Sequence, residues 1–109
     1  MFHPPIETVR LEAILHALSD PVRVQIFSEI AGADCALACQ AFTSVNDHQI
    51  PKSTLSQHFK VLREAGLIHS ERQGVEMRNT SRCVEVDSRF PGLVAAIINA
   101  HAIEALRAA

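Results

Sequence analysis

The sequence has no tryptophan or tyrosine, and its 109 residues include only four glycines and five prolines. This composition excludes collagen-like chains and Gly/Pro-rich disordered chains. Hydrophobic residues make up 48% of the chain and charged residues 20%, which is sufficient for a folded protein with a buried core. The length predicts a single domain that spans residues 1–109.

Long hydrophobic runs are also missing. The longest stretch without a charged residue, Phe90 to Ile103, has 14 residues, whereas crossing a bilayer takes about 18 to 20 apolar residues. The first residues, Met-Phe-His-Pro-Pro, lack the basic and then apolar pattern of a secretory signal. We therefore expect a cytoplasmic protein with no membrane partner.

Cysteine is scarce and odd in number, with Cys35, Cys39 and Cys83. In a reducing compartment such residues are expected as free thiols or ligands and not as structural disulfides.

Positive charge is concentrated in one part of an otherwise acidic chain. Residues 52–82 hold six basic and three acidic side chains, whereas the rest of the chain holds four basic and nine acidic ones. A folded domain that gathers residues 52–82 on one face would present a locally positive surface, which is typical of nucleic-acid binding.

Helical periodicity and capping residues divide the chain into elements. A stripe of Leu11, Ile14, Leu15 and Leu18 predicts a helix within residues 6–18. Asp20 and Pro21 are typical of a helix start, and they predict a second helix that stops at Gly32. A shorter helix is predicted over residues 36–42, followed by a polar loop over 43–49.

The second half of the chain predicts a helix, a hairpin and a last helix. The stripe Leu55, Phe59 and Leu62 lies in a helix over residues 51–65 that Gly66 ends. Two strand-like segments flank Gln73-Gly74 within residues 67–82. With a helix over 91–108, the order α-α-α-α-β-β-α predicts a mainly α fold with a β-hairpin wing, a winged helix-turn-helix.

Two segments at this separation resemble the ArsR/SmtB family of bacterial transcriptional regulators. Residues 17–26, ALSDPVRVQI, are similar to the family's opening signature, and residues 52–68, KSTLSQHFKVLREAGLI, look like its recognition helix. The resemblance implies a homodimeric repressor that binds operator DNA and releases it when an effector acts.

The face of the 51–65 helix opposite its apolar stripe carries short polar and cationic side chains, which suit base edges and phosphates in a major groove. Two arginines flank the hairpin turn and are candidates for a neighbouring minor groove or its phosphates. The predicted DNA contacts are Lys52, Ser53, Thr54, Ser56, Gln57, Lys60, Arg72 and Arg78. Within this set we expect Gln57 to pair with adenine and Lys52 and Lys60 to contact phosphates.

The last helix has apolar residues on more than one face, and these exceed what one core contact can cover. We therefore expect a dimer through residues 6–18 and 91–108. The candidate interface residues are Leu11, Leu15, Leu93, Ile97, Ile98 and His101.

Many relatives of this kind sense metal. One family site places Asp-x-His on the last helix ten residues before His-x-x-Glu; this chain has His101 and Glu104 but Ser88 and Phe90 in place of the first pair. Two of four ligands are absent, which argues against a tetrahedral site there.

Cys35 and Cys39 are four residues apart, so a helix would place both sulfurs on one face, a suitable pair of ligands for a soft metal or metalloid ion. This spacing departs from the family's Cys-x-Cys-x-x-Cys motif. Two other interpretations stay open: the thiols pack as small hydrophobic side chains, or they form a redox switch.

No phosphate-binding loop, nucleophile elbow or zinc-protease helix occurs, so the sequence does not predict an enzyme. The alternative to a DNA-binding regulator is a winged-helix module that binds a protein partner through its apolar last helix.

Overall fold

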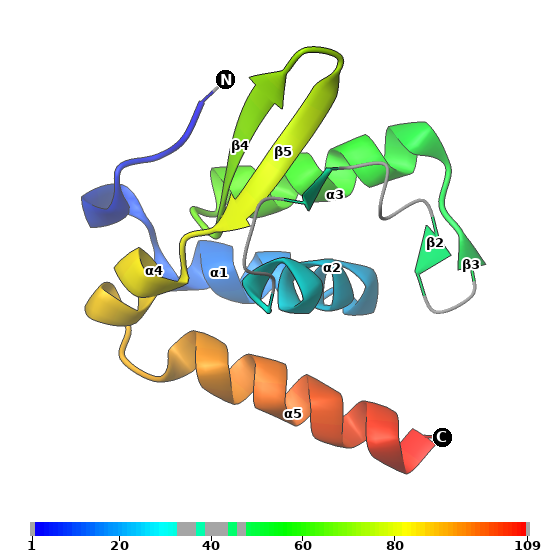
Figure 1. The fold of residues 1–109 in the computed structure, drawn as a ribbon. Coiled ribbons are helices and arrows are strands. Elements are labelled where there is room, and N and C mark those ends of the chain that lie inside the picture. The colour runs from blue at the N-terminus through cyan, green and yellow to red at the C-terminus, as the bar shows by residue number, and fades with distance from the viewer. Residues whose placement is uncertain (1, 33–36, 39–43, 46–47, 109) are drawn as a thin grey trace.

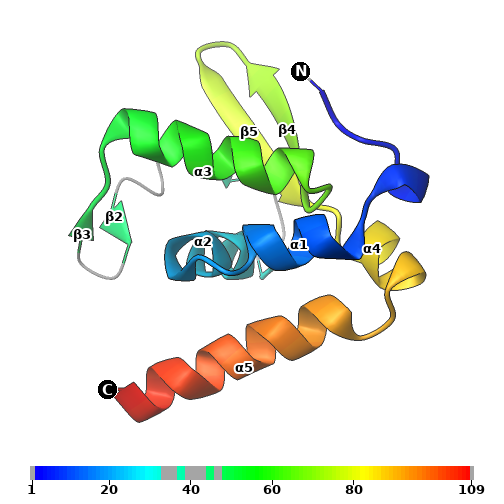
Figure 2. The same cartoon turned by 180° about the vertical axis from the view of Figure 1, so that it is seen from behind.

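The computed structural model describes residues 2–32, 37–38, 44–45 and 48–108. Helices lie beneath a β-hairpin, and the longest helix, α5, runs along the opposite side of the molecule from the hairpin (Figures 1 and 2). The elements are η1 (Ile6–Thr8), α1 (Leu11–Ala17), α2 (Pro21–Ala31), β1 (Leu37–Ala38), β2 (Ser44–Val45), β3 (His48–Gln49), α3 (Lys52–Glu64), β4 (Ile68–Gln73), β5 (Glu76–Ser81), α4 (Cys83–Arg89) and α5 (Leu93–Ala108). Within the described ranges, no helix has the length and apolar character needed to cross a membrane.

The start of α2 follows the predicted capping pattern. Oδ1 of Asp20 accepts hydrogen bonds from the backbone N–H groups of Val22 (2.8 Å) and Arg23 (3.3 Å). Pro21 occupies the first position of the helix, where its missing N–H costs no hydrogen bond. This short turn places α2 directly after α1.

The core lies between α1, α2 and α3 and continues to β4, α4 and α5. The predicted stripe of α3 is confirmed, since Leu55, Phe59 and Leu62 are buried. The largest fully buried side chains include Phe27, Ile14, Ile26, Leu62, Leu67, Ile68 and Val86. Their burial supplies the main stabilisation of the fold.

The end of α3 is held by a glycine that no other residue can replace without strain. Gly66 has φ of +84°, and its N–H bonds to the Arg63 carbonyl while the N–H of Leu67 bonds to the Leu62 carbonyl, the Schellman pattern. A Cβ at this position would lie 2.4 Å from Cγ2 of Val9. Gly66 thus turns the chain from α3 into β4 against the segment before α1.

The hairpin of β4 and β5 is antiparallel, with Ser70 opposite Asn79 and Glu71 opposite Arg78. β1 pairs with β5 on its other side, so the sheet order is β1-β5-β4. Asn79 and Ser70 are buried, and the Ser70 hydroxyl donates to Oδ1 of Asn79 over 2.7 Å.

Two expectations about secondary structure need correction, and one helix was not predicted. Leu37 and Ala38 form strand β1 and not a helix, because the edge of β5 offers them backbone hydrogen bonds; residues 36 and 39–42 of the predicted helix lie outside the described part. Residues 44–45 and 48–49 of the predicted loop pair as β2 and β3. Helix α4 had no counterpart among the predicted elements, and its seven residues contain one buried side chain, Val86. The winged helix-turn-helix fold itself is confirmed.

Replacing Gly66 with alanine should destabilise the protein by about 2 to 4 kcal/mol, because left-handed strain adds to the overlap with Val9. Urea denaturation gives the free energy of unfolding. Gly74→Ala is the matched control, since Gly74 also has a positive φ, +66°, but no atom within 4 Å of the added Cβ. Equal destabilisation of the two variants would contradict the role of the Val9 contact.

Candidate nucleic-acid interface

The outer face of α3 presents the predicted contact residues to solvent. The buried stripe of α3 lies on the opposite side of the helix. All six predicted contact residues on this helix are exposed: Lys52, Ser53, Thr54, Ser56, Gln57 and Lys60. They combine amide, hydroxyl and ammonium groups on one helix face. Such a face can hydrogen-bond base edges and neutralise phosphates.

Arg23 connects this helix to the two helices beneath it. Its Nε donates to the Ala17 carbonyl over 2.7 Å, and Nη2 donates to the His16 carbonyl over 3.1 Å. Nη1 lies 3.5 Å from Nδ1 of His58 on α3 and 3.7 Å from the Asp20 carboxylate. The guanidinium therefore joins the end of α1, the start of α2 and the middle of α3.

Arg23 was not among the predicted functional residues, although it is part of the ALSDPVRVQI segment. Its side chain is only 12% exposed. An arginine that follows shortly after the end of a helix is suited to bind that helix's last carbonyls. The position of Arg23 shortly after the predicted end of the first helix could therefore have indicated this role.

The two wing arginines lie on opposite faces of the hairpin. Successive residues of a strand point to opposite sides, so Arg72 shares a face with Ser70, whereas Arg78 shares the other face with Glu71 and Glu76. Arg78 forms an ion pair with Glu76 at 2.7 Å, and Arg72 is exposed near the turn. Arg72 is thus the better placed of the two for a phosphate.

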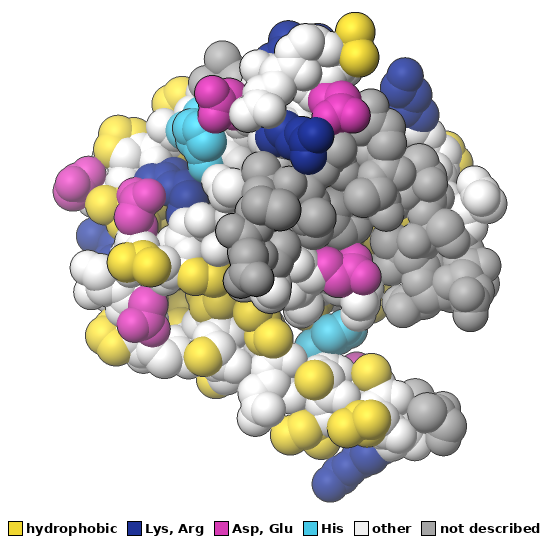
Figure 3. Space-filling view, in the orientation of Figure 1, with side chains coloured by type: hydrophobic (Ala, Val, Ile, Leu, Met, Phe, Trp, Pro, Cys, Tyr) yellow, Lys and Arg dark blue, Asp and Glu magenta, His cyan; other side chains and the backbone are white. Residues whose placement is uncertain are grey.

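The apolar residues of α1 and α5 divide into two groups. Leu93, Ile97 and Ile98 are partly buried against the core, while Leu11 and Leu15 are exposed. Two further exposed residues on α5, Ile103 and Leu106, were not among the interface candidates. Hydrophobic side chains follow α4 and α5 over the lower part of the surface (Figure 3).

His101 packs inward, and its Nε2 lies 3.0 Å from Oε1 of Gln25 on α2. Glu104, the other residue of the His-x-x-Glu pair, is exposed. Ser88 and Phe90 offer no carboxylate or imidazole, and the described part of the chain contains no group of three or more His, Cys, Asp or Glu residues able to hold a metal ion. The residues therefore do not fit the family's zinc site on the last helix.

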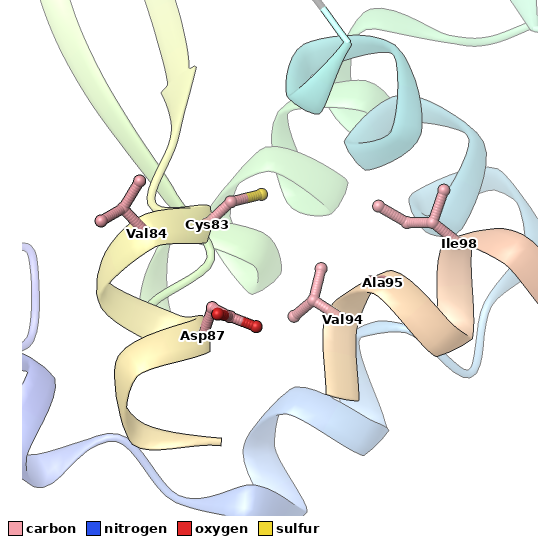
Figure 4. A pocket seen from close by; sticks show the side chains of 6 residues that line it. All are labelled: Cys83, Val84, Asp87, Val94, Ala95 and Ile98. Carbon is pink, nitrogen blue, oxygen red and sulfur yellow. The ribbon is translucent and has the colours of Figure 1, made fainter. Parts of the chain in front are cut away.

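Cys35 and Cys39 lie outside the described residues. Between them, Leu37 and Ala38 are extended in β1, so the continuous helix that would align the two sulfurs is not formed. Cys83 begins α4 and lines a cavity of about 390 Å³ between α4 and α5, together with apolar side chains and Asp87 (Figure 4). None of the predicted contact residues for DNA lines this cavity.

Comparison with known proteins agrees with this architecture. Residues 18–71 match the family model described as a helix-turn-helix domain. The structure is similar to that of an ArsR-like transcriptional regulator from Rhodococcus sp. RHA1, with a TM-score of 0.59 and 22% sequence identity over 89% of this chain and 83% of that one. No curated protein matches the sequence.

The exposed polar helix, the helix pair beneath it and the hairpin define a winged helix-turn-helix protein. The matching helix-turn-helix model and the similar fold of the ArsR-like regulator agree with this class.

Arg72 is exposed whereas Arg78 is paired with Glu76, so we expect their replacement to change DNA binding differently. Arg72→Ala should lower the slope of log K against log salt for DNA binding by about 0.9 for each phosphate that the arginine neutralises, whereas Arg78→Ala should leave it nearly unchanged because Glu76 already pairs with Arg78. Fluorescence anisotropy at several salt concentrations measures both slopes. A larger change for Arg78→Ala would show that its face of the wing meets DNA.

Proposed function

We propose that residues 1–109 act as one winged helix-turn-helix unit of a homodimeric repressor that holds operator DNA through α3 and the wing. The exposed polar and cationic face of α3 carries this proposal, because six adjacent side chains able to contact DNA lie on it. In winged proteins of this class, such a helix enters the major groove.

The side chains of α3 divide by chemistry into base readers and phosphate contacts. The amide of Gln57 can donate to and accept from one adenine edge, and the methyl group of Thr54 can pack on a thymine methyl. Lys52 and Lys60 lie near the two ends of this face and carry the charge that phosphates require.

Gln57→Ala should reduce discrimination between operator and unrelated DNA by about 1 to 3 kcal/mol per half-site. Lys60→Ala should weaken binding to all DNA alike and reduce the salt slope by about 0.9 per phosphate. Gel-shift titrations on the DNA upstream of the protein's own operon, beside a shuffled sequence, measure both effects. Absence of any salt-dependent binding by the native chain would instead favour the protein-interaction module.

The second copy in this proposal covers apolar surface on α1 and α5. Leu11 and Leu15 lie one turn apart on α1, and Ile103 and Leu106 lie on one side of α5, all exposed in the single chain. Burying these side chains in a two-fold contact removes them from water, and the stretch of α5 from residue 93 to residue 103 contains no Lys, Arg, Asp or Glu.

Leu106→Asp should convert the dimer to a monomer without unfolding it, because Leu106 is 77% exposed in the single chain. Sedimentation at tens of micromolar and circular dichroism check the two parts of this expectation. Val84→Asp is the control: Val84 is also highly exposed, at 86%, but lies on α4 outside the proposed contact. A native chain that sediments as a monomer would refute the dimer.

Release by an effector also stays a prediction. A soft metal or metalloid ion on Cys35 and Cys39 is the proposed form, and the two thiolates would have to approach each other without the helical spacing that the sequence suggested. Arsenite-induced release of operator DNA is measured in the native protein and in the Cys35→Ser, Cys39→Ser double variant. Release by the native protein alone supports a site on these thiols, whereas equal release by both proteins contradicts it.

A further inference from the structure

The amino-terminal segment runs beside the wing in both views of the fold (Figures 1 and 2). In the sheet order β1-β5-β4, the strand β4 is at the edge, so one side of it has no strand partner within the described residues. Backbone groups on such an edge need other partners. The amino-terminal segment supplies one of them.

His3 binds this edge with its ring. The backbone N–H of Ser70 donates to Nε2 of His3 over 2.9 Å, and the ring stacks on that of His69 with centroids 4.3 Å apart. Because the backbone N–H is only a donor, Nε2 must be unprotonated, so the ring is neutral and carries its proton on Nδ1. The contact exists only in the uncharged state of His3.

A second contact holds the same segment. Nη1 of Arg82 donates to the Pro4 carbonyl over 2.8 Å, and Nη2 of Arg82 pairs with Glu85 at 2.8 Å. The Arg82 side chain is only 9% exposed. Residues 3 and 4 are therefore tied both to β4 and to the segment that follows β5.

Ser70 extends the contact across the wing. Its N–H binds His3, and its hydroxyl donates to Asn79 on β5. One residue thus connects the amino-terminal segment with both strands that carry the wing arginines.

The surroundings of His3 oppose a positive charge. Its pKa is lowered by burial first, then by the charges of His69 on β4, Arg63 on α3, Arg82 and the amino terminus; Glu85 is paired with Arg82. A lowered pKa in the folded state means that the contact stabilises the protein fully above the ordinary histidine range and is lost as pH falls through the lowered value.

We propose that His3 is a positioning residue which straps the amino-terminal segment to the open edge of β4 and thereby steadies the wing. The strap itself follows from these contacts, while its consequence for DNA rests on the proposed function. None of these contacts involves a side chain that the proposed function assigns to DNA.

Amide hydrogen exchange at Ser70, followed by NMR on the full chain with any tag at the carboxyl end, tests the strap. In the native protein, the protection factor of the Ser70 amide should fall as pH is lowered from 7.5 to 5. His3→Phe keeps a stacking ring but no acceptor, and should lower the protection at pH 7.5 by about tenfold. His3→Gln supplies an amide oxygen that does not titrate, and should keep the protection across the whole range.

His16→Gln is the control, because it removes an exposed histidine on α1 and should leave the Ser70 profile as in the native protein. Equal protection in the native and His3→Phe proteins, or a fall with pH that persists in His3→Gln, would overturn the strap.

DNA binding at pH 7.5 provides the second measurement. His3→Phe should weaken operator binding by about threefold with an unchanged salt slope, since His3 meets no phosphate in this arrangement, and His3→Gln should restore it. A Ser70 amide that exchanges freely while DNA affinity stays at the native value would overturn the effect on the wing. If the native chain binds no DNA, the proposed function fails, and the Ser70 measurements still decide whether the strap exists.

Discussion

The position of α3 depends on one arginine side chain that is only 12% exposed. Arg23 lies on the first turn of α2, and two of its N–H groups bind the last carbonyls of α1, where a positive charge is favoured. Its remaining edge faces Asp20 and His58. Lysine, with one compact ammonium group, could not reach these separate acceptors in a fixed plane. The guanidinium therefore helps to hold α3 against the two lower helices, together with the buried stripe of Leu55, Phe59 and Leu62.

This arrangement separates the groups that hold the fold from those available for recognition. The polar groups of the α1–α2 corner and the wing base bind each other, as in the pairs Arg23–Ala17 and Ser70–Asn79. Along the outer face of α3 the side chains are exposed. Replacing a side chain on this face changes few internal contacts and should have little effect on the free energy of unfolding.

Local signals were sufficient to predict the main helices, the hairpin and the exposed face of α3. Asp20, Pro21 and Gly66 act within a few residues of their own position, and the stripe of Leu55, Phe59 and Leu62 needs only helical periodicity. Contacts between residues far apart in the sequence have no such local signal. β1 forms because β5 offers an edge much later in the chain, and His3 meets Ser70 across 67 positions. The exposure of Leu106 and the pairing of Arg78 with Glu76 likewise required the fold.

Gly66 also determines what can be exchanged between proteins of this architecture. The residues from Ala65 to Ile68, which lead from α3 into β4, are buried. The side chain of Val9, from the segment before α1, occupies the space that a Cβ of residue 66 would need. The junction between α3 and the wing is thus closely packed. If α3 and the wing were transplanted into another scaffold, a side chain of similar shape to Val9 beside the glycine would be needed to keep this packing. The junction that packs here as one body therefore consists of two pieces of chain that are far apart in sequence.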